Sequence, residues 1–264
     1  MTLRLGLNVN RARREAAEFA DRLTAECRRH GITTVTLDEE CPVDIAVAVG
    51  GDGTVLETAR LALAREVGLL GFNLGTIGFL AEVEPRQLEW VVTRLAAGAY
   101  RVEKRMTLQA AIPGLGRELE VGVNDVVVEK IESQRLVVLD VEVDGESFLA
   151  YRADGIVIAT PTGSTAYAFS AGGPLVDPSL ECLLVTPVAP HSLFNRSLVL
   201  PPGVSVRVKV ADDRPVRVSV DGREIGEVHE GGAIDITRGP TPVGFVRFDA
   251  EGFPGRVTRK FGLT

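Results

Sequence analysis

The stretch Asp44-Ile-Ala-Val-Ala-Val-Gly-Gly-Asp-Gly-Thr54 passes from an unbroken apolar run into three glycines that surround one aspartate. Residues 45–49 are small or β-branched without polar alternation, which is typical of a central parallel strand buried on both faces. The glycines allow a sharp turn with bare backbone amides, and residues 55–64 are predicted to form a helix. A strand, a glycine turn and a helix N-terminus together indicate an anion site, for which phosphate is the expected ligand.

Asp52 stands out in this turn because a carboxylate beside phosphate is repelled unless a metal ion lies between them or a proton is moved. One interpretation makes Asp52 a helix N-cap, a role that aspartate often fills. Thr54 could cap equally well, however, and capping does not need a glycine on each side of the cap. The strand-turn-helix context therefore favours a functional role for Asp52.

The composition limits the class of protein. The chain has 264 residues, a formal charge of −7 and three cysteines without a C-x-x-C pair. This length can bury a large core, and the cysteine pattern predicts free thiols in a reducing cytosol without structural zinc. No apolar run approaches the roughly 18 residues of a membrane span, and the acidic charge argues against general nucleic-acid binding. We expect a soluble, cytoplasmic protein.

The first 98 residues are predicted to form an α/β domain with a parallel Rossmann-like sheet. Strands are expected at 3–9, 32–37, 45–49 and 67–72, and helices at 13–30, 55–64 and 85–97. Ligands of such sheets bind at the carboxyl ends of the strands, where the glycine turn lies. A second glycine-punctuated turn occupies residues 73–80, and its glycines could serve a loop or a binding site equally well.

Residues 99–245 are predicted to form a second, mostly β domain. The period changes to two, and short strands are expected at 156–159, 183–185, 204–210, 216–220 and 233–237, with a hairpin over 135–151 and a tight turn at Asp221-Gly222. Two interruptions stand out. Asn124-Asp125 places an amide and a carboxylate between apolar residues, which on its own favours a structural network. Residues 154–174 are rich in small hydroxyl side chains, glycine and alanine, which favours a ligand-binding wall.

The whole pattern resembles the NAD kinase family. Gly50-Gly51-Asp52-Gly53-Thr54 is similar to the signature of the superfamily that joins NAD kinases, diacylglycerol and sphingosine kinases, and 6-phosphofructokinases. The Asn-Leu-Gly-x-x-Gly-Phe-Leu turn, the Asn-acid pair and the Thr-Pro-Thr-Gly-Ser-Thr-Ala-Tyr run follow in the order of NAD kinases. The resemblance implies transfer of a phosphoryl group from ATP to the 2′-hydroxyl of the adenosine ribose of NAD. It also implies a homodimer or homotetramer, and a tail, 246–264, that returns to the first domain.

The resemblance also implies roles for individual residues. Asp52 would be the general base on the 2′-hydroxyl of NAD, and Asp52 and Gly53 would both contact NAD. The phosphate-binding positions would be Gly50, Gly51, Gly53 and Thr54. Asn124 and Asp125 would hold the ribose hydroxyls of NAD, and Asp154 would lie near the adenine. The other implied NAD-binding positions are Arg135, which would reach a phosphate from a neighbouring subunit, and Arg152, Thr165, Ala166, Tyr167, Ala168, Phe169, Ser170 and Arg223.

Three positions depart from the family pattern. Asp125 stands where glutamate is commoner, Arg223 where glutamine is expected, and Asn195-Arg196-Ser197 where an Arg-Pro pair is usual. The chain also lacks a G-x-x-x-x-G-K-[ST] loop, so no lysine is indicated for the γ-phosphate. Mg²⁺ or Mn²⁺ accompanying ATP, together with backbone amides, is expected to neutralise the phosphates, and no protein side chain is indicated as a fixed metal ligand.

Two other functions remain open from the sequence. A lipid or sugar kinase of the same superfamily would need an apolar cleft, whereas the hydroxyl-rich wall predicts a polar one. A non-catalytic NAD-binding regulator would not need Asp52. The phosphoryl donor is also open among ATP, other nucleoside triphosphates and polyphosphate, and NADH is an alternative acceptor. A dehydrogenase is disfavoured because no G-x-G-x-x-G follows a strand.

Overall fold

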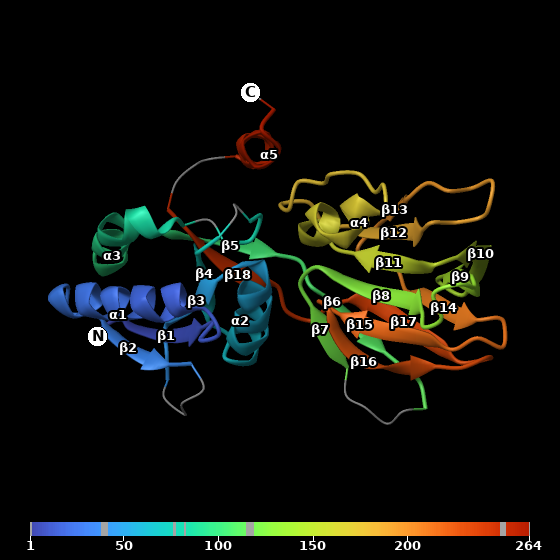
Figure 1. The fold of residues 1–264 in the computed structure, drawn as a ribbon, viewed down its shortest axis with the longest axis horizontal. Coiled ribbons are helices and arrows are strands. Elements are labelled where there is room, and N and C mark those ends of the chain that lie inside the picture. Colours follow the sequence, from blue (N-terminus) through green and yellow to red (C-terminus); the bar gives the residue numbers. More distant parts are fainter. Residues whose placement is uncertain are drawn as a thin grey trace. The chain divides into compact units, whose positions relative to one another are not determined.

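The computed structural model describes residues 2–37, 42–75, 78–81, 83–114, 119–248 and 252–263. The chain divides into two compact units, unit 1 with Met1–Lys104 and Val243–Thr264, and unit 2 with Arg105–Pro242 (Figure 1). These boundaries lie a few residues from the divisions expected at 98 and 245. Unit 1 is an α/β domain and unit 2 is mostly β, so the predicted fold class is confirmed.

Unit 1 is built on one six-stranded sheet. Its strands are, in sheet order, β2 (Thr33–Thr36), β1 (Arg4–Val9), β3 (Ile45–Gly50), β4 (Gly68–Asn73), β18 (Val243–Arg247) and β5 (Arg101–Arg105). Neighbouring strands from β2 to β18 are parallel. The helices are α1 (Arg14–Arg29), α2 (Asp52–Ala64), the 3₁₀ helix η1 (Pro85–Gln87), α3 (Leu88–Ala96) and α5 (Phe253–Phe261).

The side chains of β3 explain how the helices of unit 1 pack. Ile45, Val47 and Val49 share one hydrophobic cluster with residues of α1 and α3. Ala46 and Ala48 alternate with them and are fully buried on the opposite face, where small residues allow α2 to approach closely. A Cβ on Gly71 of the adjacent strand would lie only 3.1 Å from the Val55 side chain of α2. This close packing fixes the N-terminus of α2 against the end of β3.

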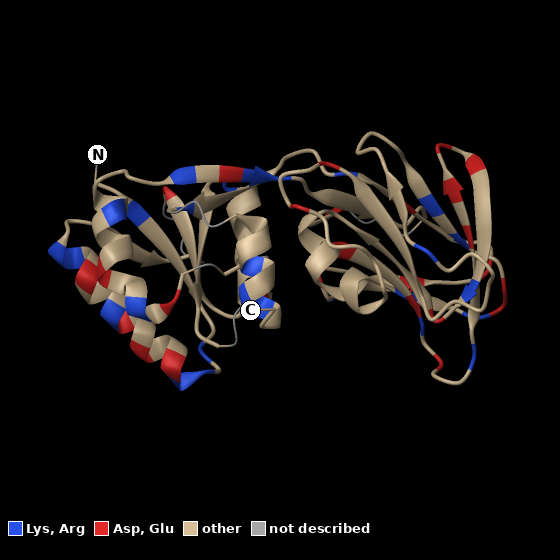
Figure 2. Cartoon of the chain, turned by 90° about the horizontal axis from the view of Figure 1, so that it is seen from above, with Lys and Arg blue, Asp and Glu red and all other residues tan. Residues whose placement is uncertain are grey.

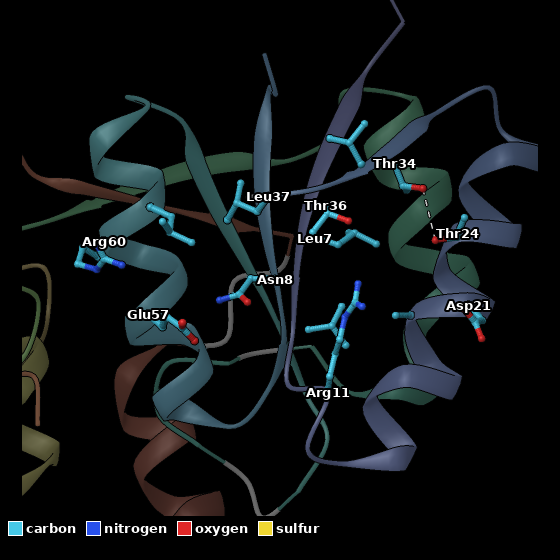
Figure 3. Close-up of a pocket in the computed structure, with 14 residues that line it drawn as sticks. Leu7, Asn8, Arg11, Asp21, Thr24, Thr34, Thr36, Leu37, Glu57 and Arg60 are labelled. Carbon is cyan, nitrogen blue, oxygen red and sulfur yellow. Dashed lines mark hydrogen bonds between the residues drawn. The ribbon is translucent and has the colours of Figure 1, made fainter. Parts of the chain in front are cut away.

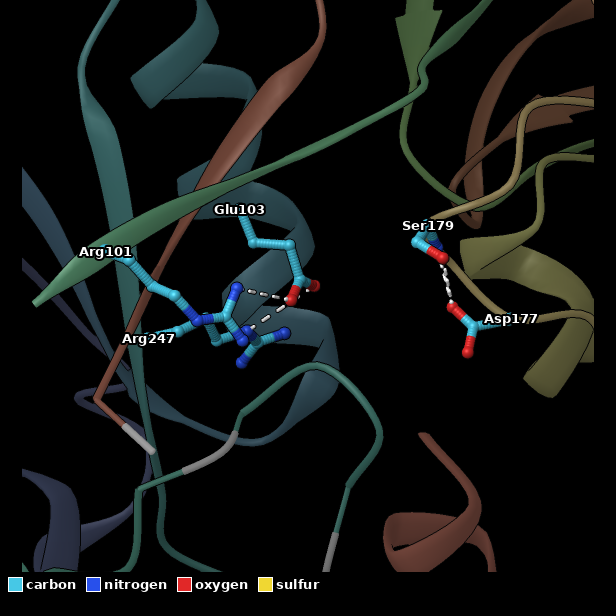
Figure 4. Close-up of polar contacts among 5 residues, drawn as sticks. All are labelled: Arg101, Glu103, Asp177, Ser179 and Arg247. Atoms are coloured by element: carbon cyan, nitrogen blue, oxygen red, sulfur yellow. Dashed lines mark hydrogen bonds and ion pairs between the residues drawn. The ribbon is translucent and has the colours of Figure 1, made fainter. Parts of the chain in front are cut away.

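The last strand, β18, comes from the far end of the chain and lies between β4 and β5. Its Arg247 is 2% exposed and pairs with Glu103 of β5 at 3.7 Å, and Glu103 also accepts a hydrogen bond from Arg101 at 3.2 Å (Figure 4). These ion pairs join the C-terminal strand to the strand that leaves unit 1. The sequence analysis predicted neither β5 nor β18, because both are short and carry charged residues.

Unit 2 contains two antiparallel sheets of six strands each. One has the order β10 (Glu146–Ala153), β9 (Val137–Val143), β14 (Val206–Val210), β17 (Ala233–Arg238), β6 (Leu108–Ala111) and β7 (Glu120–Gly122). The other has the order β13 (Leu198–Leu200), β12 (Leu183–Val188), β11 (Gly155–Ala159), β8 (Asp125–Lys130), β15 (Val216–Val220) and β16 (Arg223–Val228). The main hydrophobic core draws side chains from both sheets.

The outer face of the second sheet carries the short helices of unit 2. These are the 3₁₀ helix η2 (Thr162–Thr165) and α4 (Tyr167–Ser170). Ala168 of α4 packs on Val127, Val157 and Leu184 of the sheet in a separate hydrophobic cluster. The hydroxyl-rich segment of the sequence is therefore an ordered layer over the sheet.

Charges of both signs are mixed along the chain, as along α1, where Lys or Arg residues alternate with Asp or Glu residues (Figure 2). Within the described ranges, no helix is long and apolar enough to cross a membrane. Cys27 and Cys182 are buried free thiols. Cys41 lies outside the described residues.

Candidate active site

Asp52 is the first residue of α2, at the point where the buried strand β3 ends. Gly51 occupies the N-cap position, so the N-cap interpretation of Asp52 does not hold. The Asp52 carboxylate instead accepts hydrogen bonds from three backbone amides of the second glycine turn: Phe79 at 3.1 Å, Leu80 at 3.4 Å and Ala81 at 3.4 Å. The main chain of one turn therefore holds the carboxylate of the other.

The close approach of Asp52 requires a glycine at position 78 of the second turn. A Cβ at this position would lie 2.0 Å from Oδ1 of Asp52, well inside van der Waals contact. Any side chain there would displace the carboxylate. Thr76 and Ile77, the middle of the predicted turn, lie outside the described residues. The two glycine turns, which are far apart in sequence, thus form one structure around Asp52.

The first turn keeps its own backbone bare. A Cβ at Gly51 or Gly53 would meet no atom of the described residues within 4 Å, so both positions are open to a ligand among those residues. Gly50 differs, because a Cβ there would lie 2.3 Å from the Thr54 hydroxyl. The side chain of Thr54 is buried, which leaves its backbone amide as the group that faces the turn. The backbone amide of Thr54 donates to the carbonyl of Gly51 at 3.0 Å. The amides of this turn that are left free, among the described residues, are therefore those of the glycines that precede Thr54.

Unit 1 also has a cavity of about 850 Å³ beside its sheet (Figure 3). Residues of β1, β2, α1 and α2 line it, and its polar lining includes Asn8, Arg11 and Arg60. Thr34 of β2 donates a hydrogen bond to Thr24 of α1 at 3.3 Å on one wall. Arg11 follows β1 directly, and the neighbouring Asn10 amide donates to the carbonyl of Val49 at 3.1 Å. The loop that carries Arg11 is thereby joined to the end of β3, where the glycine turn begins.

In unit 2, Asn124 and Asp125 stand at the start of β8. A carboxylate from another turn, Asp221, accepts the amides of Val123 at 2.7 Å, Asn124 at 2.7 Å and Asp125 at 3.2 Å. Asp221 has a φ of 49° in the tight turn that it forms with Gly222, and that conformation aims its side chain back at this backbone. The sequence analysis identified the turn but not the function of its carboxylate.

The side chains of Asn124 and Asp125 are nearly buried, at 8% and 5% exposure. The Oδ1 atom of Asn124 has no hydrogen-bond partner among the described residues, which is unusual for a buried polar atom. Burial, together with the nearby charge of Asp221, raises the pKa of Asp125 to about 7. Burial also raises the pKa of Asp221, but its three amide donors oppose that shift. Asp125 therefore titrates near neutral pH.

Below these residues, the predicted ligand wall is fixed by buried hydroxyls. The Thr160 hydroxyl donates to the carbonyl of Val123 at 2.6 Å and accepts the amide of Gly163 at 3.2 Å. A Cβ on Gly163 would lie 2.1 Å from the carbonyl oxygen of Asn124. Glycine is thus required where η2 crosses the start of β8, and the crossing places the hydroxyl-rich segment beside Asn124.

Tyr167 of α4 lies among carboxylates. Because side chains alternate along β8 and Val126 and Val128 enter the core, Asp125 and Glu129 face the layer that contains α4. Partial burial raises the pKa of the Tyr167 phenol, and the charges of Glu129, Asp154 and Asp125 raise it further. Tyr167 is 38% exposed, so its ring remains accessible beside this acidic face.

The remaining predicted positions of unit 2 differ in their contacts. Asp154 forms an ion pair with Lys130, a residue to which the sequence analysis gave no role. Ala168 is buried in the layer under α4, whereas Phe169 is 37% exposed. Thr165 and Ala166 are partly buried at the junction of η2 and α4, and Ser170 is exposed. Residues 165–170 thus belong to the layer that η2 and α4 form over the second sheet.

Three predicted arginines do not join this layer through any contact that the structure records. Arg135 is exposed and precedes β9, which begins at Val137, two residues later than expected. Arg152 is exposed on β10. Arg223 forms an ion pair with Glu120 at the surface. Their roles remain predictions.

No group of three or more His, Cys, Asp or Glu side chains that could hold a metal ion occurs in the described part of the chain.

Comparison with protein families gives two matches that together cover most of the chain. The ATP-NAD kinase N-terminal domain matches residues 6–100, and the ATP-NAD kinase C-terminal domain matches residues 123–248. NAD kinase 2 of Streptomyces avermitilis is 40% identical over 264 residues, covering 99% of this chain and 86% of that protein. The NAD kinase of Nocardia farcinica is 44% identical over 223 residues, covering 83% of this chain and 69% of that protein.

Two solved structures share the fold. A yeast NADH kinase in complex with NADH has a TM-score of 0.89 at 23% identity and covers 100% of this chain and 88% of its own. An NAD kinase from Archaeoglobus fulgidus in complex with ATP has a TM-score of 0.77 at 26% identity and covers 99% of this chain and 98% of its own. The first of these likenesses concerns the fold alone.

Proposed function

The chain belongs to the ATP-NAD kinase family, and we propose that it transfers the γ-phosphoryl group of ATP to the 2′-hydroxyl of the adenosine ribose of NAD, giving NADP. The observation that carries this proposal is the setting of Asp52. A carboxylate fixed by three backbone amides stands at a helix N-terminus beside bare glycine amides. That combination places a proton acceptor next to an anion site, which transfer of a phosphoryl group to a hydroxyl requires.

Asp52 orients the 2′-hydroxyl and accepts its proton as the new O–P bond forms. A strong base is not needed, because the loose transition state of phosphoryl transfer depends more on positioning and on neutralisation of charge. The three amide donors restrict the carboxylate to one orientation, so its free lone pairs are directed before substrate binds. The amides of Gly51 and Gly53 bind phosphate oxygens at the same turn.

Unit 2 binds NAD through its adenosine half. Asn124 and Asp125 bind ribose hydroxyls, Asp154 lies near the adenine, and Tyr167 packs on the adenosine. The unsatisfied Oδ1 of Asn124 supports this assignment, because a ligand hydroxyl would supply the missing donor. The negative charge around Tyr167 suits hydroxyls and amines and disfavours phosphate.

ATP binds to unit 1, with its phosphates on the glycine turn. The volume of the cavity lined by α1 and α2 lies in the range of small-molecule sites, so the cavity can hold a nucleoside. Arg11 lines this cavity on the side of the glycine turn. Mg²⁺ or Mn²⁺ held by the phosphates of ATP would supply neutralisation of the charge on the transferred group. We further propose that the enzyme is cytoplasmic and forms a homodimer or homotetramer. Light scattering of the purified protein would test the oligomeric state.

The proposal is tested by incubating the purified protein with NAD, ATP and Mg²⁺, and separating the nucleotides. The Asp52→Asn variant should lose roughly 10²- to 10⁴-fold in kcat, the usual contribution of a general base. Its affinity for NAD should remain close to that of the parent. Asp213→Asn is the matched control, since the Asp213 side chain is 84% exposed and lies in unit 2. NADH and polyphosphate are tested in parallel as alternative acceptor and donor.

Formation of NADP by the parent and by Asp213→Asn, with near-complete loss in Asp52→Asn, would support the proposal. If the parent binds NAD but phosphorylates neither NAD nor NADH with any donor, the kinase assignment is wrong and the protein is an NAD-binding regulator.

A further inference from the structure

The C-terminal helix α5 lies against the turn that holds Asp52. It spans Phe253–Phe261, begins with Pro254 in its first turn and ends at Gly262, which adopts the left-handed conformation with a φ of 60°. The amide of Leu263 closes the helix by donating to the carbonyl of Thr258 at 3.1 Å. The helix therefore has a capped C-terminus, and Lys260 and Phe261 lie in its last turn.

Phe79 receives the end of α5. The Phe261 ring lies 5.9 Å from the Phe79 ring, measured between centroids, with a tilt of 49°. The ammonium group of Lys260 lies 5.9 Å from the centroid of the same ring. These are the distances of an aromatic pair and a cation–π contact, so both residues attract Phe79 directly. A third link is the ion pair of Arg259 with Glu84, at 3.8 Å.

The backbone of Phe79 is in direct contact with Asp52. Its N–H donates the shortest of the three hydrogen bonds to the carboxylate, at 3.1 Å. Residues 78–81 belong to no helix or strand, so no regular backbone ladder fixes their position. Gly78 contributes no side chain. Leu80 and Ala81 are buried in unit 1, and the packing of the Phe79 ring adds a connection from this turn to α5.

We propose that Phe261 and Lys260 are positioning residues for phosphoryl transfer, which hold Asp52 in its working orientation through Phe79. This inference rests on the proposed function, because it concerns the same carboxylate. The far end of the chain then takes part in catalysis without touching substrate. Displacements of about 1 Å at a reacting group can cost about 10²-fold in rate, so a loosened Phe79 is expected to be visible in kcat.

The first test is Phe261→Ala, with steady-state kinetics for both substrates. We expect kcat to fall by roughly 10- to 100-fold while KM for NAD stays within about twofold, because the NAD-binding residues lie in unit 2. Phe261→Tyr keeps the ring and should recover most of the activity. Lys260→Met keeps the stem but removes the charge, and should lower kcat by a few-fold.

Phe148→Ala is the matched control. Phe148 is 38% exposed, against 40% for Phe261, and it forms a similar ring pair with Phe194 at 5.6 Å in unit 2. The control should keep the parental kcat. Phe261→Leu, which keeps apolar volume but lacks the ring, replaces Phe261→Ala if that variant melts below the assay temperature, and it should show the same selective loss of kcat.

A double-mutant cycle separates positioning from a general structural effect. In the Asp52→Asn background, Phe261→Ala should cause little further loss, because the group that Phe261 positions is already inactive. An equal loss of kcat in both backgrounds would show that Phe261 does not act through Asp52. Parental kcat in Phe261→Ala would also overturn the inference. If the parent itself forms no NADP, the proposed function fails first, which distinguishes the two outcomes.

Discussion

The two polar regions of the molecule are built in opposite ways. In unit 1 a carboxylate, Asp52, is held by three backbone amides of another turn. In unit 2 three consecutive backbone amides, from Val123 to Asp125, are held by the carboxylate of Asp221. The first arrangement fixes a side chain by means of the main chain, and the second fixes the main chain by means of a side chain.

This difference matches the work that each region does in the proposed reaction. A group that orients a hydroxyl and accepts its proton must itself be immobile, so Asp52 uses its hydrogen bonds to stay in place. A group that recognises a ligand needs free hydrogen-bonding capacity. Because Asp221 fixes the backbone at Asn124 and Asp125, their side chains are left for a ligand, as the unpartnered Oδ1 of Asn124 indicates.

The largest effect is expected from Gly78→Ala, which places a Cβ 2.0 Å from Oδ1 of Asp52. The carboxylate must move, and kcat should fall by about 10²-fold, while KM for NAD changes little. Gly75→Ala is the control, because its Cβ would meet only the end of Arg13, at 3.4 Å. A Gly78→Ala enzyme with parental kcat would show that the turn does not fix Asp52.

A smaller effect, on KM and not on kcat, is expected from Gly163→Ala in unit 2. The new Cβ would lie 2.1 Å from the carbonyl oxygen of Asn124, so η2 and the start of β8 must separate. KM for NAD should rise about tenfold, which corresponds to about 1.4 kcal/mol of lost binding. At Gly203 a Cβ would meet nothing within 4 Å, and Gly203→Ala should leave KM unchanged. Loss of kcat alone in Gly163→Ala would contradict the division of roles.

The free energy of unfolding is expected to depend on pH through Asp125 in unit 2. Its pKa is raised from 3.8 to about 7 in the folded protein, so the folded state binds more protons than the unfolded state between these values. The free energy of unfolding should therefore decrease as pH rises from about 4 to about 7, by at most about 1.4 kcal/mol per pH unit. Asp125→Asn should remove most of this decrease and be the more stable protein above pH 7.

Urea unfolding of the parent, Asp125→Asn and the exposed control Asp213→Asn at several pH values between 4 and 8 would measure this dependence. Parallel pH curves for all three proteins would mean that Asp125 is not the group responsible.

The smallest effect is expected at Arg223, which forms a surface ion pair with Glu120. Its side chain is 50% exposed, and exposed ion pairs contribute about 0 to 1 kcal/mol. Arg223→Gln should therefore leave KM for NAD within about threefold of the parental value. A rise above tenfold would place Arg223 on the substrate, as the resemblance to the family implies.

Part of this molecule could be predicted from the sequence because the signals are local. The apolar run that ends at Gly50 is a fully buried strand, and the helix predicted after the glycines forms, but it begins at Asp52, three residues earlier than expected. The mostly β character of unit 2 followed from the two-residue period and from turns such as Asp221-Gly222. In each case the backbone preference of neighbouring residues already favours the element that forms.

Other features could not be predicted because they join residues that are distant in the chain. Nothing near Asp221 indicates that its carboxylate receives amides 96 to 98 residues away. Lys130 carried no motif, and its ion pair with Asp154 depends on the pairing of β8 with β11. The strand β18 was missed because a short charged strand is stable only beside the partners that the fold provides.

The sequence by itself determined the two kinds of domain, the strand-turn-helix around Asp52 and the family to which the chain belongs, because these depend on the order of residues within short segments. Only the tertiary structure decided what holds each functional group. Gly78 is a glycine because Asp52 folds against it, and Phe79 is held by a helix nearly 180 residues further along the chain. Hydrogen bonds and ring contacts act over a few ångströms, and which residues come that close is set by the packing of the whole domain.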